Sequence, residues 1–143
     1  KSGDKSALGL ILNNKGVTQK DLKQYEEALA SLNESLKINR ENGNKRQERF
    51  NLNNISVIYV EINRPGEAIE KLNQLLVLNE EMHDTVELIN NFQNLGTAYT
   101  GMKDYLKAES SYIKALELSE KNGSAEMKQK VLSELSTIYR LQG

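Results

Sequence analysis

The stretch "FQNLGTAYTGMKDYLKAESSYIKAL", residues 92–116, decides the fold because it contains one structural unit that recurs along the chain. Its first part places apolar or small side chains three and four residues apart, which is the spacing of one face of an α-helix. A short break with turn residues follows, and the second part returns to the helical spacing. The stretch therefore predicts two helices joined by a tight turn.

The unit recurs every 40 residues without a gap. The segments "LNNKG", "LNNIS", "FQNLG" and "LSELS", whose first residues are 12, 52, 92 and 132, fall on one another when the sequence is shifted by 40. A fixed period of this length is typical of helical repeat proteins. The register predicts seven helices, in repeats at residues 5–43, 45–83 and 85–123 and a final unpaired helix at 125–141.

Turn residues mark the ends of the units. Gly43 and Gly123 suit the left-handed position after a helix, and His83, the only histidine, takes the same register between them. We expect His83 to be exposed in a turn and to take no part in catalysis or phosphorylation. Pro65 lies at or near the first turn of a helix, where its missing N–H costs nothing. The residues placed to cap the helices that follow are Asn44 and Ser124.

The third unit resembles the tetratricopeptide repeat (TPR) family. The resemblance extends over the whole chain and implies an all-α, right-handed solenoid of helix-turn-helix repeats, a single domain over residues 1–143 that binds proteins or peptides. The period of 40 rather than roughly 34 residues is a departure, and so is the absence of the proline that often closes the unit. The matching residues are Phe92, Leu95, Gly96, Tyr99, Ala108, Tyr112 and Ala115.

TPR arrays with longer repeats resemble those of kinesin light chains, cell-polarity adaptors and bacterial signalling regulators with a TPR sensor region. The favoured function is therefore a non-catalytic sensor or scaffold region of a bacterial regulatory protein. Two alternatives stay open: a structural assembly or cargo adaptor, and the regulatory region of a sensor kinase. The repeat register begins after one unit and stops halfway through another, so we expect the chain to be part of a longer protein.

Composition narrows the class of partner. The chain has 19 basic and 20 acidic residues and a formal net charge of -1, which gives no field to attract nucleic acid. No apolar run approaches the roughly 18 residues of a membrane helix, so no membrane insertion is expected. Cysteine is absent and histidine occurs once, and no phosphate-binding or nucleophile motif is present. We therefore expect no metal, no cofactor and no enzyme activity.

Side-chain amides recur at one angle of the first helix in three successive units. In a solenoid, one angle on successive helices becomes one line along the array, and in TPR arrays the corresponding face lines the concave groove. An amide carries both a donor and an acceptor, so a row of amides can hold the backbone of an extended peptide, as in the asparagine ladders of long-repeat TPR proteins. The predicted groove residues are Leu10, Asn13, Asn14, Val17, Phe50, Asn53, Asn54, Val57, Val60, Asn90, Gln93, Asn94 and Thr97.

Other interpretations of this face remain. About one residue in nine is asparagine. In the competing interpretation, some of these amides are therefore only solvated side chains or helix caps and bind no ligand. A carboxylate clamp needs Lys or Arg beside Asn, but Lys20, Lys130 and Arg140 are scattered in the sequence. Glu61 and Glu134 are expected on the same side as the asparagines, so we do not expect a clamp. The final helix has an apolar edge, Leu132, Leu135 and Tyr139, which predicts weak self-association.

Overall fold

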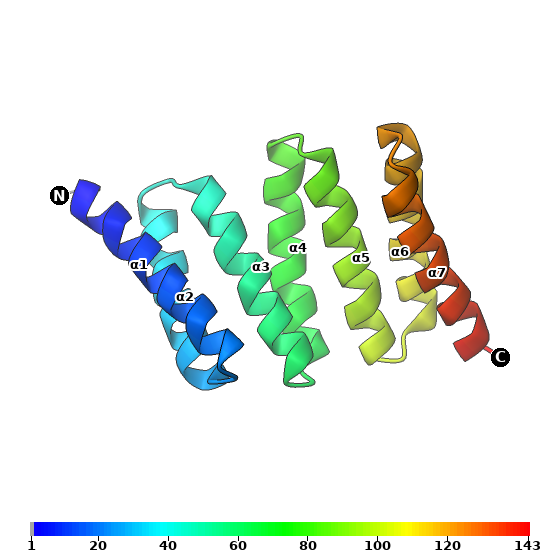
Figure 1. Cartoon of the computed structure of the whole chain (residues 1–143), viewed down its shortest axis with the longest axis horizontal. Helices are drawn as coiled ribbons and strands as arrows, with labels where there is room; N and C mark the ends of the chain where they lie inside the picture. The colour runs from blue at the N-terminus through cyan, green and yellow to red at the C-terminus, as the bar shows by residue number, and fades with distance from the viewer. Residues whose placement is uncertain (1) are drawn as a thin grey trace. The chain divides into compact units, whose positions relative to one another are not determined.

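The computed structural model describes residues 2–143, and it describes their side chains from Gly3 onward. Within this range the chain forms seven α-helices and no strand (Figure 1). The prediction of an all-α fold with seven helices is therefore confirmed. The helices are α1 (Ser2–Asp21), α2 (Tyr25–Glu41), α3 (Lys45–Glu61), α4 (Pro65–Glu81), α5 (Thr85–Gly101), α6 (Tyr105–Asn122) and α7 (Ala125–Leu141).

The turns between helices contain residues with positive φ at intervals of 20 residues. Gly43 and Gly123 have φ of 65° and 71°, as expected for glycine after a helix. His83 takes the same conformation, with φ of 53°, and its side chain is exposed as predicted. The residues with positive φ in the described chain are Lys23, Gly43, Asn63, His83, Lys103, Gly123 and Gly143.

Polar side chains begin several of the helices. Asn44 accepts a hydrogen bond from the backbone N–H of Gln47 at 3.2 Å, and Ser124 accepts one from Met127 at 3.3 Å. Asp84 and Asp104 cap α5 and α6 in the same way. Each of these bonds satisfies one of the N–H groups that a helix start leaves without an intrahelical partner.

The helices form two compact units, one that ends at Lys71 and one that begins at Leu72. The boundary lies inside α4, and the repeat pattern, which predicts a single domain, contains no signal of a division there. In the first unit α2 packs against α1 and α3, and in the second α6 packs against α5 and α7 (Figure 1). The buried apolar residues are Ala28, Leu32, Leu36, Leu52, Ile55, Ile58 and Ala68 in the first unit and Leu72, Leu75, Leu78, Ile89, Leu95, Ala98, Ala108, Tyr112, Ala115, Val131, Leu135 and Ile138 in the second.

The glycines of the repeat motif allow the two helices of a pair to approach closely. A Cβ atom added to Gly16 would lie 2.6 Å from Cγ of Leu32, and one added to Gly96 would lie 2.6 Å from the ring of Tyr112. Both distances are far shorter than van der Waals contact between carbon atoms. The absence of a side chain at these two positions therefore lets Leu32 and Tyr112 fill the interior of their units.

Each unit also contains a buried pair of asparagines that the sequence analysis did not single out. In the first unit Asn39 Nδ2 donates to Asn51 Oδ1 at 2.7 Å, and in the second Asn79 Nδ2 donates to Asn91 Oδ1 at 3.2 Å. All four side chains are at most 1% exposed. Buried amides are costly unless they are paired, so these residues, 40 apart in register, belong to the fold.

Candidate functional site

The predicted groove residues of the first unit lie on α1 and α3, which pack against each other. Their exposure varies along this surface, which we call the α1/α3 face. Leu10, Asn14, Phe50 and Val60 are exposed, and Phe50 retains 46% of its accessible surface. Val17, Asn53, Asn54 and Val57 are half-buried, whereas Asn13 is buried.

The open amides of the α1/α3 face have few partners within the chain. The side chains of Asn14 and Asn53 make no hydrogen bond with any residue that the structure describes. Asn54 Nδ2 donates to the backbone oxygen of Phe50 at 2.9 Å, one turn earlier, and Asn54 Oδ1 accepts from Lys20 Nζ at 3.5 Å. This surface thus presents amide groups with unused donors and acceptors beside apolar side chains.

Asn13 does not belong to that open surface, which corrects the prediction. It is 7% exposed, and its Oδ1 accepts a hydrogen bond from Asn51 Nδ2 at 2.9 Å. Asn51 Nδ2 also donates to Ser35 Oγ, whose own hydroxyl donates to the backbone oxygen of Gly9 at 2.6 Å. The amide of Asn13 is therefore part of a buried network that holds α1, α2 and α3 together.

The predicted residues of the second unit lie on α5. Asn90 and Asn94 are half-buried, and within the described chain their side chains make no hydrogen bond. Thr97 is exposed; its Oγ1 donates to the backbone oxygen of Gln93 at 3.1 Å and lies 3.2 Å from the hydroxyl of Tyr112. Gln93 is only 3% exposed, and its Nε2 donates to Glu134 Oε2 on α7 at 3.1 Å. Gln93 thus supports a neighbouring carboxylate rather than presenting an open amide.

Glu134 was not predicted as a site residue, and its surroundings are unusual for a carboxylate. Partial burial raises the pKa of Glu134, while the hydrogen bond from Gln93 and the positive charge of Lys130 act in the opposite direction. Burial also raises the pKa of the Tyr112 hydroxyl, and the charge of Glu134 adds to that rise. The only signal in the sequence is that Glu134 stands in the register of Asn14, Asn54 and Asn94.

The cations that a carboxylate clamp would need are engaged in other ways. Lys20 lies beside Asn54, as noted above, and its Nζ is also 3.8 Å from Asp21 Oδ1. Arg140 Nη2 donates to Thr137 Oγ1 at 3.4 Å on its own helix. Lys20 thus lies beside one of the groove asparagines, whereas its position in the sequence does not indicate this contact. Among the described residues, Lys20 is the one cation that bonds to the Asn54 side chain.

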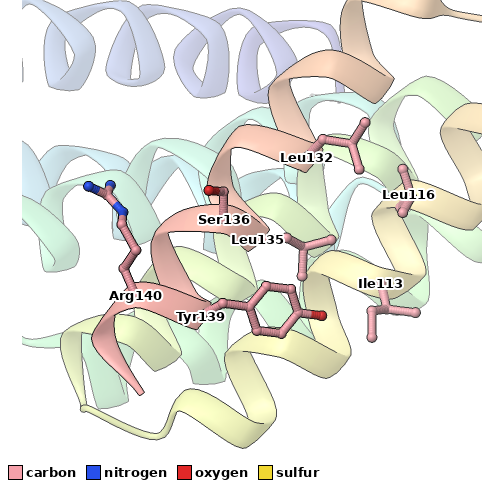
Figure 2. Close-up of a pocket in the computed structure, with 7 residues that line it drawn as sticks. All are labelled: Ile113, Leu116, Leu132, Leu135, Ser136, Tyr139 and Arg140. Carbon is pink, nitrogen blue, oxygen red and sulfur yellow. The ribbon is translucent and has the colours of Figure 1, made fainter. Parts of the chain in front are cut away.

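An apolar groove between α6 and α7 is the second open surface of the second unit (Figure 2). Its volume is about 600 Å³. Leu132 and Tyr139 are 40% and 51% exposed, in agreement with an uncovered edge, but Leu135 is 5% exposed because it packs in the core of the unit. The residues that line the groove are Ile113, Leu116, Leu132, Leu135, Ser136, Tyr139 and Arg140.

The described residues contain no group of three or more His, Cys, Asp or Glu side chains that could hold a metal ion. No helix in the described part of the chain is long and apolar enough to cross a membrane.

Comparison with known proteins identifies the family. Models of the tetratricopeptide repeat match residues 8–81 and residues 89–122. The chain belongs to the tetratricopeptide repeat family. The TPR resemblance and the all-α TPR solenoid class predicted from the sequence are therefore confirmed. No curated protein matched the chain.

Solved TPR structures share this fold at low sequence identity. The apo form of RapI is 22% identical, with a TM-score of 0.89 over 97% of this chain and 39% of RapI. The first TPR of Spaghetti (RPAP3), bound to an HSP90 peptide, is 19% identical, with a TM-score of 0.73 over 96% of this chain and 94% of that one. The TPR2AB domain of yeast Sti1, in complex with pHSP90, is 20% identical, with a TM-score of 0.75 over 95% of this chain and 49% of that one. The chain thus spans about two fifths of the length of RapI.

Proposed function

We propose that this TPR chain is a non-catalytic module that binds extended peptide segments. The groups that hold a peptide backbone are the open amides of α1 and α3 in the first unit and, separately, those of α5 in the second unit. The observation that carries the proposal is the contrast between two asparagines on α3. Asn51 is fully buried and has three hydrogen bonds. Asn53 is partly open, and its amide makes no hydrogen bond within the described chain.

The fold gains little from Asn53 at this place. Asparagine is a poor residue for the interior of a helix because its amide competes with the backbone for hydrogen bonds. Asn51 compensates for this cost by its buried bonds, whereas Asn53 has no such bonds. A ligand that pairs with the free amide is the simplest physical reason for asparagine there.

The chemistry of the α1/α3 face suits a peptide in an extended conformation. Amides of Asn14, Asn53 and Asn54 offer both donors and acceptors, which match the N–H and C=O groups of a peptide backbone whatever its side chains. Exposed Leu10 and Phe50 supply the apolar surface that binding sites also need. Spaghetti (RPAP3), which shares the fold, is solved with an HSP90 peptide, and yeast Sti1 is solved in a complex with pHSP90. These complexes support a peptide as the class of ligand.

The favoured setting is the sensor or scaffold region of a bacterial signalling protein, because the 40-residue repeat resembles those of bacterial TPR regulators. The apolar groove between α6 and α7 favours the adaptor as the second candidate. An exposed apolar edge on a helix pair is a surface for another helix, and a structural adaptor uses such surfaces to hold a complex together.

Selection from a random-peptide display library tests the proposed function. We expect the chain to retain peptides and the variants Asn14→Ala and Asn53→Ala to bind them more weakly, because each leaves a peptide group without its partner. Asn33→Ala is the matched control, since Asn33 is an exposed asparagine of α2 whose amide bonds only to the backbone of its own helix. The assignment of the site to the α1/α3 face would be refuted if the affinity for the retained peptides fell equally in all three variants. It would also be refuted if the affinity fell in none of them.

A further inference from the structure

We propose that Glu134 forms a subsite for a cationic side chain, lysine or arginine, of a peptide bound on the second unit. The inference rests on the proposed peptide-binding function and adds the chemistry of one ligand residue to it. The subsite lies on the second unit, where α7 meets the open face of α5. It consists of the Glu134 carboxylate and the Gln93 amide that orients it.

Glu134 is a partly buried carboxylate without a cationic partner. Its one hydrogen bond comes from the neutral amide of Gln93 at 3.1 Å, and it makes no ion pair with a described residue. Taking a charge out of water is costly unless an opposite charge compensates it. The hydrogen bond from Gln93 compensates part of this desolvation cost. No described cation of the unit pairs with Glu134 to compensate the rest.

Other partly buried carboxylates of this chain are compensated by ion pairs with arginine. Glu48 accepts a hydrogen bond from Arg40 Nε at 2.8 Å, and Glu67 accepts one from Arg64 Nε at 2.7 Å. Both pairs join a carboxylate to a guanidinium within the first unit. Lys130, an exposed residue one helical turn before Glu134, lowers the pKa of that carboxylate by its charge but forms no ion pair with it in the described chain.

The neighbours of Glu134 leave access for a ligand and hold the carboxylate in place. Ser133 and Thr137 on α7 are exposed, and Asn94 on α5 is only half-buried. Gln93 is buried and fixed by its packing, so its Nε2 sets the orientation of the Glu134 carboxylate. The second carboxylate oxygen is free to accept a charge-assisted hydrogen bond, which is shorter and stronger than a neutral one.

The charges that face Glu134 favour a cation over an anion. Lys130 is the one cationic group among the causes of the shifted Glu134 pKa. The Tyr112 hydroxyl is neutral at physiological pH, as tyrosine ordinarily is, and burial raises its pKa further. An acidic peptide side chain would meet repulsion and would leave two carboxylates in a partly desolvated place. Lysine and arginine place a charge at the end of a long stem, so they can reach the carboxylate from a peptide that lies on α5.

The test compares peptides that the parent chain and the variant Glu134→Gln retain from one random-peptide display library. We expect the parent to enrich Lys or Arg at one peptide position and Glu134→Gln to lose that enrichment. For a selected peptide, replacement of the basic residue by glutamine should weaken binding to the parent about tenfold or more, and binding to Glu134→Gln about twofold at most. Glu117→Gln, which removes the same charge from an exposed place on α6, should keep the enrichment.

Three results would contradict parts of this account, and they are distinguishable. Peptides without a basic preference, or with the same preference in Glu134→Gln, overturn the cation subsite and leave the proposed function intact. A preference lost equally in Glu117→Gln also overturns the subsite, because the effect is then one of net charge. No retained peptide at all overturns the proposed function, and the subsite with it. Circular dichroism of both variants confirms that the comparison is made on folded chains.

Discussion

Replacement of Asn51 by alanine removes three hydrogen bonds at once from the buried network of the first unit. Its amide nitrogen donates to Asn13 Oδ1 at 2.9 Å and to Ser35 Oγ at 3.0 Å, and its oxygen accepts from Asn39 Nδ2 at 2.7 Å. In Asn51→Ala the Asn13 acceptor has no partner left, and Asn39 Nδ2 keeps only a contact of 3.3 Å with Ser35 Oγ.

The expected loss of stability follows from the groups that are left unpaired. Each buried polar group without a partner costs about 1–3 kcal/mol, and alanine returns at most about 0.7 kcal/mol as the better helix former. With the Asn13 acceptor fully stranded and Asn39 Nδ2 partly so, we expect a net loss of about 2–4 kcal/mol. At a urea m-value of about 2 kcal/mol per molar, in the middle of the usual range, the unfolding midpoint falls by about 1–2 M.

Urea unfolding followed by circular dichroism measures the midpoint, and hydrogen exchange assigns the loss to a unit. We expect faster exchange in α1, α2 and α3, because local opening reports the stability of the region that lost its contacts. Asn53→Ala is the matched control: the same substitution two residues away on α3, where no side-chain hydrogen bond is lost. Equal midpoints for Asn51→Ala and the parent, or equal losses in both variants, would refute the division of α3 into a structural and an open asparagine.

Three further predictions concern single residues. His83→Gly should be neutral or slightly stabilising in thermal melts, because φ of 53° suits glycine; a loss above about 1 kcal/mol would show a partner for the imidazole. Glu134→Gln should stabilise the chain slightly at neutral pH, because it removes a partly buried charge. The pKa of Glu134 is raised in the folded state, so ionisation of Glu134 lowers the stability of the parent chain as the pH rises from the unfolded-state pKa through the folded-state pKa. The stabilisation by Glu134→Gln should therefore vanish in acid, where the carboxyl group is protonated. A stabilisation that persists at low pH contradicts this cause. Self-association through the groove of Leu132 and Tyr139 should appear in sedimentation at high concentration and diminish in Leu132→Ser; a parent chain that stays monomeric contradicts the prediction.

The helices and turns follow from the sequence because short-range chemistry determines them. The 40-residue period places the helices, and glycine at 43 and 123 marks turns with positive φ. His83 could be placed in the same conformation from its register alone, although histidine rarely adopts it. Fold and turn geometry were therefore accessible without coordinates.

The sequence could not predict which amides are buried, because periodicity gives the helix face on which a residue lies and not the residues it contacts. Asn13 and Asn53 share one register, yet Asn13 is buried and Asn53 is partly open. The difference comes from Asn51 on α3, whose amide donates a hydrogen bond to Asn13 on α1. Gln93 likewise turns to Glu134, 41 residues later. Such pairings depend on contacts between helices. The repeated register of Asn39 with Asn79, and of Asn51 with Asn91, was the one available sign of the buried pairs.

The measurement that tests the central claim most directly combines a thermal melt with a binding isotherm for the double variant of Asn53 and Asn54 to alanine. If their amides serve a ligand, the melt is unchanged or higher, since alanine is the better helix former by up to about 0.7 kcal/mol at each position. Binding of a peptide selected on the parent chain then weakens by about 1–3 kcal/mol for each amide removed. A double variant that melts far below the parent, or that binds the selected peptide as tightly as the parent does, would contradict the account.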